Sequence, residues 1–211
     1  LGELRSINVF VVGGSNNPGN YLVKSMTTLM GALFVSGGIS DSGSMRAIEL
    51  RRQGKLVTTV DLYDLFLNGD TSNDQQLKDG DVVLISNINK TVGIAGEVRR
   101  PGLYELKEEE SILDLIEFAG GIKPTADKND AQIQRINNQR ALTMVDINPS
   151  AKNLDKNIPI DGDILRIYPI SRSFDDVILT RGLIKERGFY QWFNGIKISD
   201  VVDSFEDLLP E

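Results

Sequence analysis

The residue types that carry most enzyme chemistry are scarce in this 211-residue chain. It contains no His and no Cys, which removes the commonest general base, the thiol nucleophile, and the imidazole and thiolate ligands of metal sites. Its 30 Asp and Glu residues leave glycoside hydrolysis formally open, since two carboxylates suffice, but no pair stands out. We therefore expect a non-enzymatic protein, with no catalytic residues, no metal site and no cofactor.

Segments that could bind phosphate or calcium lack the spacing that those ligands require. The Gly13-Gly14-Ser15 segment does not follow the GxxxxGK[ST] pattern of a phosphate-binding loop. The Gly-Asp pairs at 80-81 and 162-163 lack the alternating carboxylates of a calcium loop, so we predict turns that precede a final strand. Glu108-Glu109-Glu110 is predicted to be a solvated turn, with its carboxylates near the positive end of the following helix.

Arginine pairs and two tyrosines are the remaining candidates for ligand binding. Arg99 and Arg100 could contact acidic sugars or a neighbouring subunit, as could Arg51-Arg52, although such pairs are surface residues by default. Tyr21 and Tyr104 begin predicted strands, where an aromatic side chain ordinarily packs across the strand pair. They could alternatively line a concave saccharide-binding face. The candidate ligand-binding residues are thus Tyr21, Arg99, Arg100 and Tyr104.

The sequence contains a long internal repeat, and the candidate residues Tyr21 and Tyr104 occupy equivalent positions in its two copies. Six residues recur 83 positions later in the same order: Gly13, Pro18, Gly19, Tyr21, Gly37 and Gly38 match Gly96, Pro101, Gly102, Tyr104, Gly120 and Gly121. Further along, the alignment shifts slightly and pairs Arg51 with Arg135 and Asp61 with Asp146. A repeat longer than the roughly 50 residues of solenoid units predicts separate domains, each with its own core.

A third, shorter copy begins near Val177 and ends with the chain. Four of its residues follow the second copy at an interval of 86: Gly182, Gly188, Tyr190 and Asp200, with Arg187 in place of the Pro of Pro-Gly. We expect domains at 5–87 and 88–171 and a partial third unit at 172–211. The aromatic run 189–193, which includes Trp192, is predicted to be core or a surface covered by a missing segment rather than a carbohydrate platform.

Within each copy the pattern predicts a hairpin, a helix and further strands. In the first copy, residues 7–12 read as a strand, and Pro18 and Gly19 as a turn in which Gly supplies a positive φ. A helix follows Thr28, carries Leu29, Leu33 and Phe34 on one face, and ends at Gly37-Gly38; strands are expected at 47–51, 56–60 and 82–85, around an apolar stretch at 62–67.

The second copy repeats the helix with clearer signals. Ser111 and Asp114 resemble a capping box. The apolar stripe consists of Ile112, Leu115, Ile116 and Ala119, and Gly120-Gly121 ends the helix. Pro18, Gly19, Gly37, Gly38 and their equivalents Pro101, Gly102, Gly120 and Gly121 are expected to act through backbone geometry. The order of elements predicts an α+β fold, in which a helix covers one face of a mixed sheet.

Composition narrows the class of protein. The chain is 40% hydrophobic and 25% charged, as globular domains are. Its net charge of −7 argues against binding to nucleic acid or an anionic membrane. No apolar run reaches the roughly 18 to 20 residues of a transmembrane segment. The opening Leu1-Gly2-Glu3, with neither a start Met nor a signal peptide, predicts a fragment of a longer protein.

The string GEVRRPGLY at 96–104, with Ile112-Leu113-Asp114, Phe118-Ala119-Gly120-Gly121 and Asp161-Gly162-Asp163, resembles the SLBB module, a soluble-ligand-binding β-grasp domain. The first copy carries the same frame in Pro18-Gly19-Asn20-Tyr21 and Lys78-Asp79-Gly80-Asp81. Tandem SLBB modules are typical of the outer-membrane polysaccharide export family (Wza-type). The lipobox Cys and the export domain that normally precede these modules in that family do not occur in this sequence.

The resemblance implies a periplasmic region of a capsule or exopolysaccharide export protein at the outer membrane. Its modules would stack around a ring of identical subunits, form the wall of a conduit for polysaccharide, and dock an inner-membrane co-polymerase. Two alternatives remain open: a small-ligand or saccharide-binding module, and a structural connector between other domains. A large symmetric interface would favour the conduit, whereas a deep pocket with convergent polar groups would favour a receptor.

Overall fold

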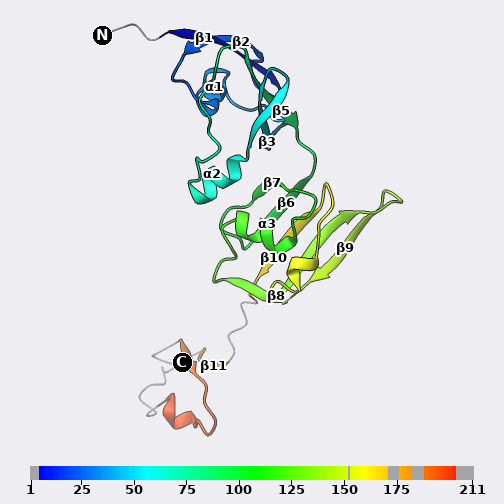
Figure 1. Cartoon of the computed structure of the whole chain (residues 1–211). Coiled ribbons are helices and arrows are strands. Elements are labelled where there is room, and N and C mark those ends of the chain that lie inside the picture. The colour runs from blue at the N-terminus through cyan, green and yellow to red at the C-terminus, as the bar shows by residue number, and fades with distance from the viewer. Residues whose placement is uncertain (1–4, 152, 171–175, 182–187, 203–211) are drawn as a thin grey trace. The chain divides into compact units, whose positions relative to one another are not determined.

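Two five-stranded mixed sheets, one from each copy of the repeat, make up the first of two units in the chain (Figure 1). The structure is a computed structural model that describes residues 5–151, 153–170, 176–181 and 188–202. The first unit ends at Pro169 and the second begins at Ile170. The predicted fold class, a mixed sheet covered by a helix in each of two copies, is confirmed.

The first sheet has the strand order β2-β1-β5-β3-β4. Its elements are β1 (Ser6–Gly13), β2 (Gly19–Lys24), α1 (Leu29–Val35), β3 (Gly43–Arg52), β4 (Lys55–Val60), α2 (Leu62–Asn68) and β5 (Asp81–Asn87). β1 and β5 run parallel in the centre, and the other pairs are antiparallel. The apolar stretch at 62–67 lies in the helix α2, which follows the edge strand β4 in the chain.

The second sheet repeats this topology as β7-β6-β10-β8-β9. Its elements are β6 (Thr91–Gly96), β7 (Gly102–Glu105), α3 (Ile112–Phe118), β8 (Ala126–Ile136), β9 (Leu142–Ile147), a 3-10 helix η1 (Leu154–Lys156) and β10 (Ile164–Pro169). The described residues between β9 and β10 contain the 3-10 helix η1 and no α-helix that corresponds to α2 of the first copy.

Each sheet buries alternate strand residues against its helix. Ile7, Val9 and Val11 of β1 face a core that also holds Leu29 and Leu33 of α1. The prediction that Phe34 shares the apolar face of α1 with Leu29 and Leu33 is wrong, because Phe34 is 78% exposed. One residue along a helix turns the side chain by about 100°, so the position after Leu33 points away from the sheet.

The predicted helix ends are confirmed. The side chains of Ser111 and Asp114 each accept a backbone N–H of the other residue, which completes the capping box. After α1 and α3, two consecutive glycines adopt positive φ: Gly37 (+79°), Gly38 (+82°), Gly120 (+78°) and Gly121 (+87°). Only glycine adopts such angles without strain, which explains both pairs.

The positive φ expected at Gly19 and Gly102 is wrong. Both residues begin strands and lie outside the left-handed region, and a Cβ there would meet nothing closer than a tyrosine ring at 3.9 Å and 3.8 Å. The restricted positions are Gly13 and Gly96 at the ends of β1 and β6, with φ of +83° and +88°. A Cβ would lie 2.1 Å or 2.0 Å from a carbonyl oxygen of the neighbouring strand at these two positions, so the backbone approach requires glycine.

Strand register corrects part of the repeat alignment. Arg51 lies opposite Val82 and Gln134 lies opposite Ile164, so the equivalent of Arg135 is Arg52, one residue later than the sequence suggested. Arg52 forms a two-pronged ion pair with the buried carboxylate of Asp81, and Arg135 forms the same pair with that of Asp163. The two Gly-Asp turns thus end in a buried structural ion pair.

The matching of Asp61 with Asp146 is also wrong. Val60 pairs with Ile48, and Ile147 pairs with Ala131, so Asp61 corresponds to Asn148. Asp61 caps α2 by accepting the Tyr63 N–H, whereas Asp146 lies within β9. Asp61 serves as a helix cap in the first copy because α2 begins there.

The second unit contains a small antiparallel pair, β11 (Val177–Leu179) with β12 (Phe189–Gln191), and a 3-10 helix η2 (Ile198–Asp200). Gly182 and Arg187 lie outside the described residues. The aromatic run is not a core, since Phe189, Trp192 and Phe193 are 61%, 46% and 53% exposed, and its role as a surface covered by a missing segment stays a prediction. Two strands of three residues are too small to enclose them. The reading of residues 172–211 as a partial SLBB unit stays a prediction.

No helix among the residues that the structure describes has the length and apolar character needed to cross a bilayer.

Candidate functional site

The two sheets of the first unit meet at a buried arginine. Arg46 lies near the start of β3 and is 7% exposed. Its Nε donates to Asp61 Oδ2 at 3.1 Å within the first copy, and its Nη2 donates to Glu110 Oε1 at 2.8 Å in the second. Its Nη1 also donates to the carbonyl oxygen of Glu105 at 3.2 Å. One side chain thus binds both copies of the repeat.

Aromatic rings enclose the Arg46 guanidinium. Its central carbon lies 4.5 Å from the ring centroid of Tyr63 on α2 and 5.0 Å from that of Phe118 on α3. The two rings pack edge to face, with centroids 5.3 Å apart. A cation held between ring faces out of water gains electrostatic attraction that a solvated cation lacks. The helices of the two copies therefore contact each other through Arg46.

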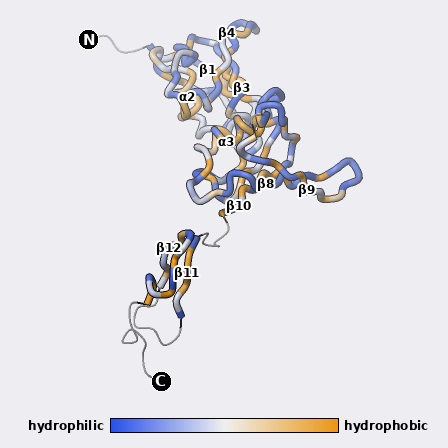
Figure 2. The backbone as a smooth tube through the Cα atoms, turned by 90° about the horizontal axis from the view of Figure 1, so that it is seen from below, coloured by the Kyte–Doolittle hydropathy of each residue, from blue (hydrophilic) through white to orange (hydrophobic). Residues whose placement is uncertain are grey.

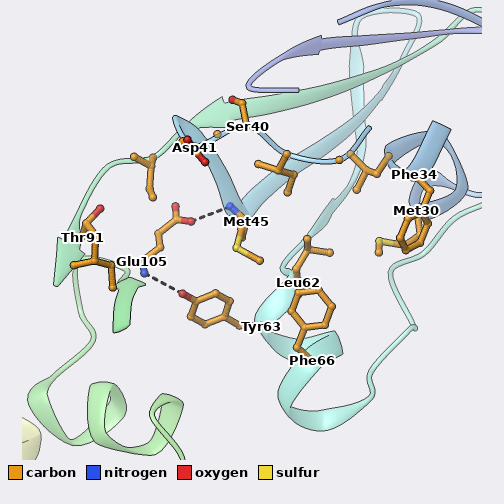
Figure 3. A pocket seen from close by; sticks show the side chains of 16 residues that line it. Met30, Phe34, Ser40, Asp41, Met45, Leu62, Tyr63, Phe66, Thr91 and Glu105 are labelled. Atoms are coloured by element: carbon orange, nitrogen blue, oxygen red, sulfur yellow. Dashed lines mark hydrogen bonds between the residues drawn. The ribbon is translucent and has the colours of Figure 1, made fainter. Parts of the chain in front are cut away.

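Glu105, at the end of β7, forms the second half of this contact. Its carboxylate accepts a hydrogen bond from Ser44 Oγ at 2.6 Å. It accepts another from the Met45 N–H at 2.9 Å (Figure 3). Its own N–H donates to the Tyr63 hydroxyl oxygen at 2.9 Å. Glu105 is 8% exposed, so its carboxylate is hydrogen-bonded by these protein groups while largely shielded from water.

The oppositely charged groups of the contact stabilise each other's charged forms. Burial alone would raise the pKa of the Asp61 carboxyl, but hydrogen bonds from Lys107, Arg46 and the Tyr63 N–H outweigh burial and lower that pKa. Burial would likewise lower the pKa of the Arg46 guanidinium, and its bonds to Glu110 and Asp61 raise it instead. Both groups are charged at neutral pH, so the contact is an ion-pair network. We call Ser44, Met45, Arg46, Asp61, Tyr63, Glu105, Lys107, Glu110 and Phe118 the inter-domain network.

A cleft of about 690 Å³ opens beside this network (Figure 3). Phe34 of α1 and Phe66 of α2 lie on one side and Thr91 of the second copy on the other (Figure 3), and Leu103 of the second copy also lines the cleft. Phe34, Phe66 and Leu103 are 78%, 62% and 74% exposed. The lining is mainly apolar, and of its two carboxylates Glu105 is already hydrogen-bonded, whereas Asp41 is exposed. This surface suits an apolar group better than a sugar, which needs several free hydrogen-bonding groups.

Two family models match the chain, each described as an SLBB domain, at residues 8–85 and 91–144. Each match falls on one of the two sheets. The chain contains two SLBB domains in tandem. The resemblance to tandem SLBB modules that the sequence showed is confirmed.

Two curated relatives, both named polysialic acid transport protein KpsD and both from Escherichia coli, are similar to this chain. Each is 27% identical over 134 residues, which is 63% of this chain and 24% of the relative. The aligned part of the chain thus spans about a quarter of the length of these relatives.

Two of the four predicted ligand-binding residues lie together. Arg100 and Tyr104 line a second hollow of about 370 Å³, which shares Met45, Tyr63, Phe66 and Leu103 with the cleft. The Tyr104 hydroxyl donates to the Arg100 carbonyl at 2.8 Å, and Arg100 Nη2 donates to the Phe118 carbonyl at 3.0 Å. These bonds tie the Pro101-Gly102 turn to the end of α3. A ligand-binding role for Arg100 and Tyr104 stays a prediction.

Tyr21 and Arg99 lie elsewhere. Tyr21 is half-buried against the core of the first SLBB domain, and its hydroxyl donates to the Asn17 carbonyl, the same bond that Tyr104 makes in the second. Arg99 is exposed, and its side chain makes no hydrogen bond with the described residues. Neither lines the cleft or the second hollow.

The inter-domain network was missed from the sequence. Glu110 was read as part of a solvated turn, but it is half-buried against Arg46. The available signal was a difference between the copies: Glu105 stands where the first copy has Leu22, and Arg46 stands where the second has Asn129. Charged residues at such unmatched positions cannot serve the shared fold, so they indicate contacts specific to one domain.

Among the described residues, no group of three or more potential metal ligands comes together.

Proposed function

We propose that this chain is a non-catalytic scaffold in the periplasmic region of an outer-membrane polysaccharide export protein. The observation that carries the proposal is the inter-domain network, which joins two tandem SLBB domains through a buried arginine in a chain similar to a polysialic acid transport protein. Domains joined by flexible linkers move freely, whereas a buried ion-pair contact holds one arrangement.

A conduit wall requires such fixed geometry. The proposed mechanism is steric and electrostatic: identical subunits form a ring, the SLBB domains of each subunit contribute to its wall, and the capsule or exopolysaccharide passes without a chemical step. An inner-membrane co-polymerase would supply the polymer to this ring. We retain the proposed boundaries at 5–87 and 88–171 for the two domains, with 172–211 as the partial third unit.

A small-ligand-binding module is the second candidate. The cleft of about 690 Å³ has the size of a ligand pocket and supports this alternative. Two of its polar groups argue against a saccharide ligand, because the Glu105 carboxylate and the Tyr63 hydroxyl already bind protein groups, which leaves Asp41 as its exposed carboxylate. The scaffold therefore remains the better-supported hypothesis. A passive connector between other domains is the third candidate.

Export in the native host tests the proposal. The full-length protein would carry Arg46→Met, and Arg99→Met would be the matched control, since Arg99 is an exposed arginine outside the network. We expect surface polysaccharide to fall and polymer to accumulate inside the cell with Arg46→Met at unchanged protein level, and no change with the control. Normal export with Arg46→Met would contradict the proposal.

A direct assay addresses the absence of a chemical step. We expect incubation of the chain with a panel of capsular polysaccharides to leave reducing ends and chain length unchanged. Reproducible cleavage that an Asp or Glu substitution abolishes would make the protein an enzyme.

A further inference from the structure

The cleft between the SLBB domains is apolar and lacks cations. Its lining residues include no Lys or Arg, and Asp41 lies among them as an exposed carboxylate without an ion pair to the described residues. Three of its apolar side chains, Phe34, Phe66 and Leu103, are more than half exposed. Clustered exposed apolar side chains of this kind mark interaction sites. An apolar partner surface that carries a positive charge would therefore be complementary to the cleft.

The same chain carries a surface of that description on the β8–β9 hairpin. In both views the hairpin extends past the other strands of its sheet (Figures 1 and 2). Ile136 lies directly opposite Leu142, and Met144 is two residues along the same face. These three side chains are 62%, 61% and 51% exposed. The opposite face of β8 points into the core through Ala131 and Ile133, so the apolar outer face is not explained by folding.

The hairpin tip is both positive and ordered. Residues 131–145 contain no Asp or Glu, and the Arg140 side chain makes no ion pair with the described residues. Asn137 organises the tip: its side chain accepts the N–H groups of Gln139 and Ala141. The equivalent hairpin of the first SLBB domain turns within two residues between Arg52 and Lys55, so the longer tip is particular to the second domain.

We propose that the β8–β9 hairpin of one copy of this chain inserts into the inter-domain cleft of the next copy. Ile136, Leu142 and Met144 would cover the exposed apolar side chains of the cleft, with Arg140 near Asp41. The contact joins two different surfaces and is therefore head to tail, so it closes into a ring when the rotation between copies permits. The inference rests on the assembly of identical subunits proposed above and specifies its two surfaces.

Disulfide trapping tests this arrangement, because the chain has no native Cys. Leu142→Cys on the hairpin would be mixed with Phe66→Cys in the cleft in a glutathione buffer. The control pair replaces Phe66→Cys by Leu22→Cys, an apolar position on β2 that is 71% exposed and lines neither hollow. We expect the mixed disulfide dimer in about tenfold excess over the control pair, the effect of one well-packed anchor on affinity. Equal yields would overturn the inference, as would dominance of the dimer linked through Leu142→Cys alone.

Complementation of surface variants gives an independent readout. A cleft variant, Phe34→Ser with Phe66→Ser, and a hairpin variant, Leu142→Ser with Met144→Ser, each retain one partner surface. We expect each alone to be monomeric by sedimentation and their mixture to stop at a one-to-one dimer. Circular dichroism would check that both fold, which is expected since all four positions are exposed. A mixture that stays monomeric at concentrations where the wild-type chain associates would overturn the head-to-tail contact.

The outcomes separate this inference from the export proposal. If the copies do not cross-link and Arg46→Met still impairs export, the hairpin contact is wrong and the scaffold function stands. If the copies cross-link and Arg46→Met exports normally, the contact stands and the scaffold function is wrong.

Discussion

Replacement of Arg46 by Met tests the energetic role of the inter-domain network. The substitution keeps an apolar stem between Tyr63 and Phe118 and removes the charge. Arg46 is 7% exposed, and the side chains of Asp61 and Glu110 are 8% and 14% exposed. Removal of one partner from a buried ion pair costs about 3–5 kcal/mol, because the remaining charge is left without compensation.

The remaining contacts place Arg46→Met at the lower end of that range. Asp61 keeps its ion pair with Lys107 at 2.8 Å and its bond from the Tyr63 N–H, and Glu110 keeps a bond from the Lys107 N–H. Lys107 is partly exposed, so water screens its compensation. We expect the free energy of unfolding to fall by about 3 kcal/mol.

Urea denaturation followed by circular dichroism measures this change, with Arg99→Met as the control. Calorimetry adds a second readout, because Arg46 joins the two SLBB domains. We expect one cooperative transition for these domains in the wild type and a separate transition for each domain in Arg46→Met. The reasoning would be refuted if Arg46→Met and Arg99→Met had the same midpoint and the same number of transitions.

Three further predictions concern single positions. Gly121→Val should lower the free energy of unfolding by about 1–2 kcal/mol, because Gly121 has a φ of +87°. Gly102→Val lies at an unstrained strand position and should change that free energy by no more than about 0.5 kcal/mol. Chemical denaturation of the full chain measures both. Tyr63→Phe should cost about 1–3 kcal/mol, because the buried Glu105 N–H loses its acceptor; an unchanged midpoint would contradict that bond. The lowered folded-state pKa of Asp61 contributes stability at pH values above its ordinary 3.8 that is lost as pH falls through the folded value. The difference in unfolding free energy between wild type and Asp61→Asn should therefore be full at pH 6 and shrink in strong acid, and a difference independent of pH would exclude the ion pair.

Local signals in the sequence were sufficient for the fold of each SLBB domain. The capping box at Ser111, the glycine pairs after both helices and the apolar stripe of α3 act within a few residues of the chain, so their patterns predict their structures. The repeat strengthened each assignment, because a residue required by the backbone is required twice. Register errors at Arg51 and Asp61 arose where the copies differ in loop length and in the presence of α2.

The contact between the domains was decided by tertiary structure alone. Arg46 meets Glu110, and Met45 meets Glu105, across 60 or more positions of the chain. The repeat gave no help, since it reveals what the domains share, and a contact between them uses residues in which they differ. Whether an arginine and a glutamate pair depends on how the two sheets are placed, and only the packing of α2 against β7 and α3 brings their charges together out of water.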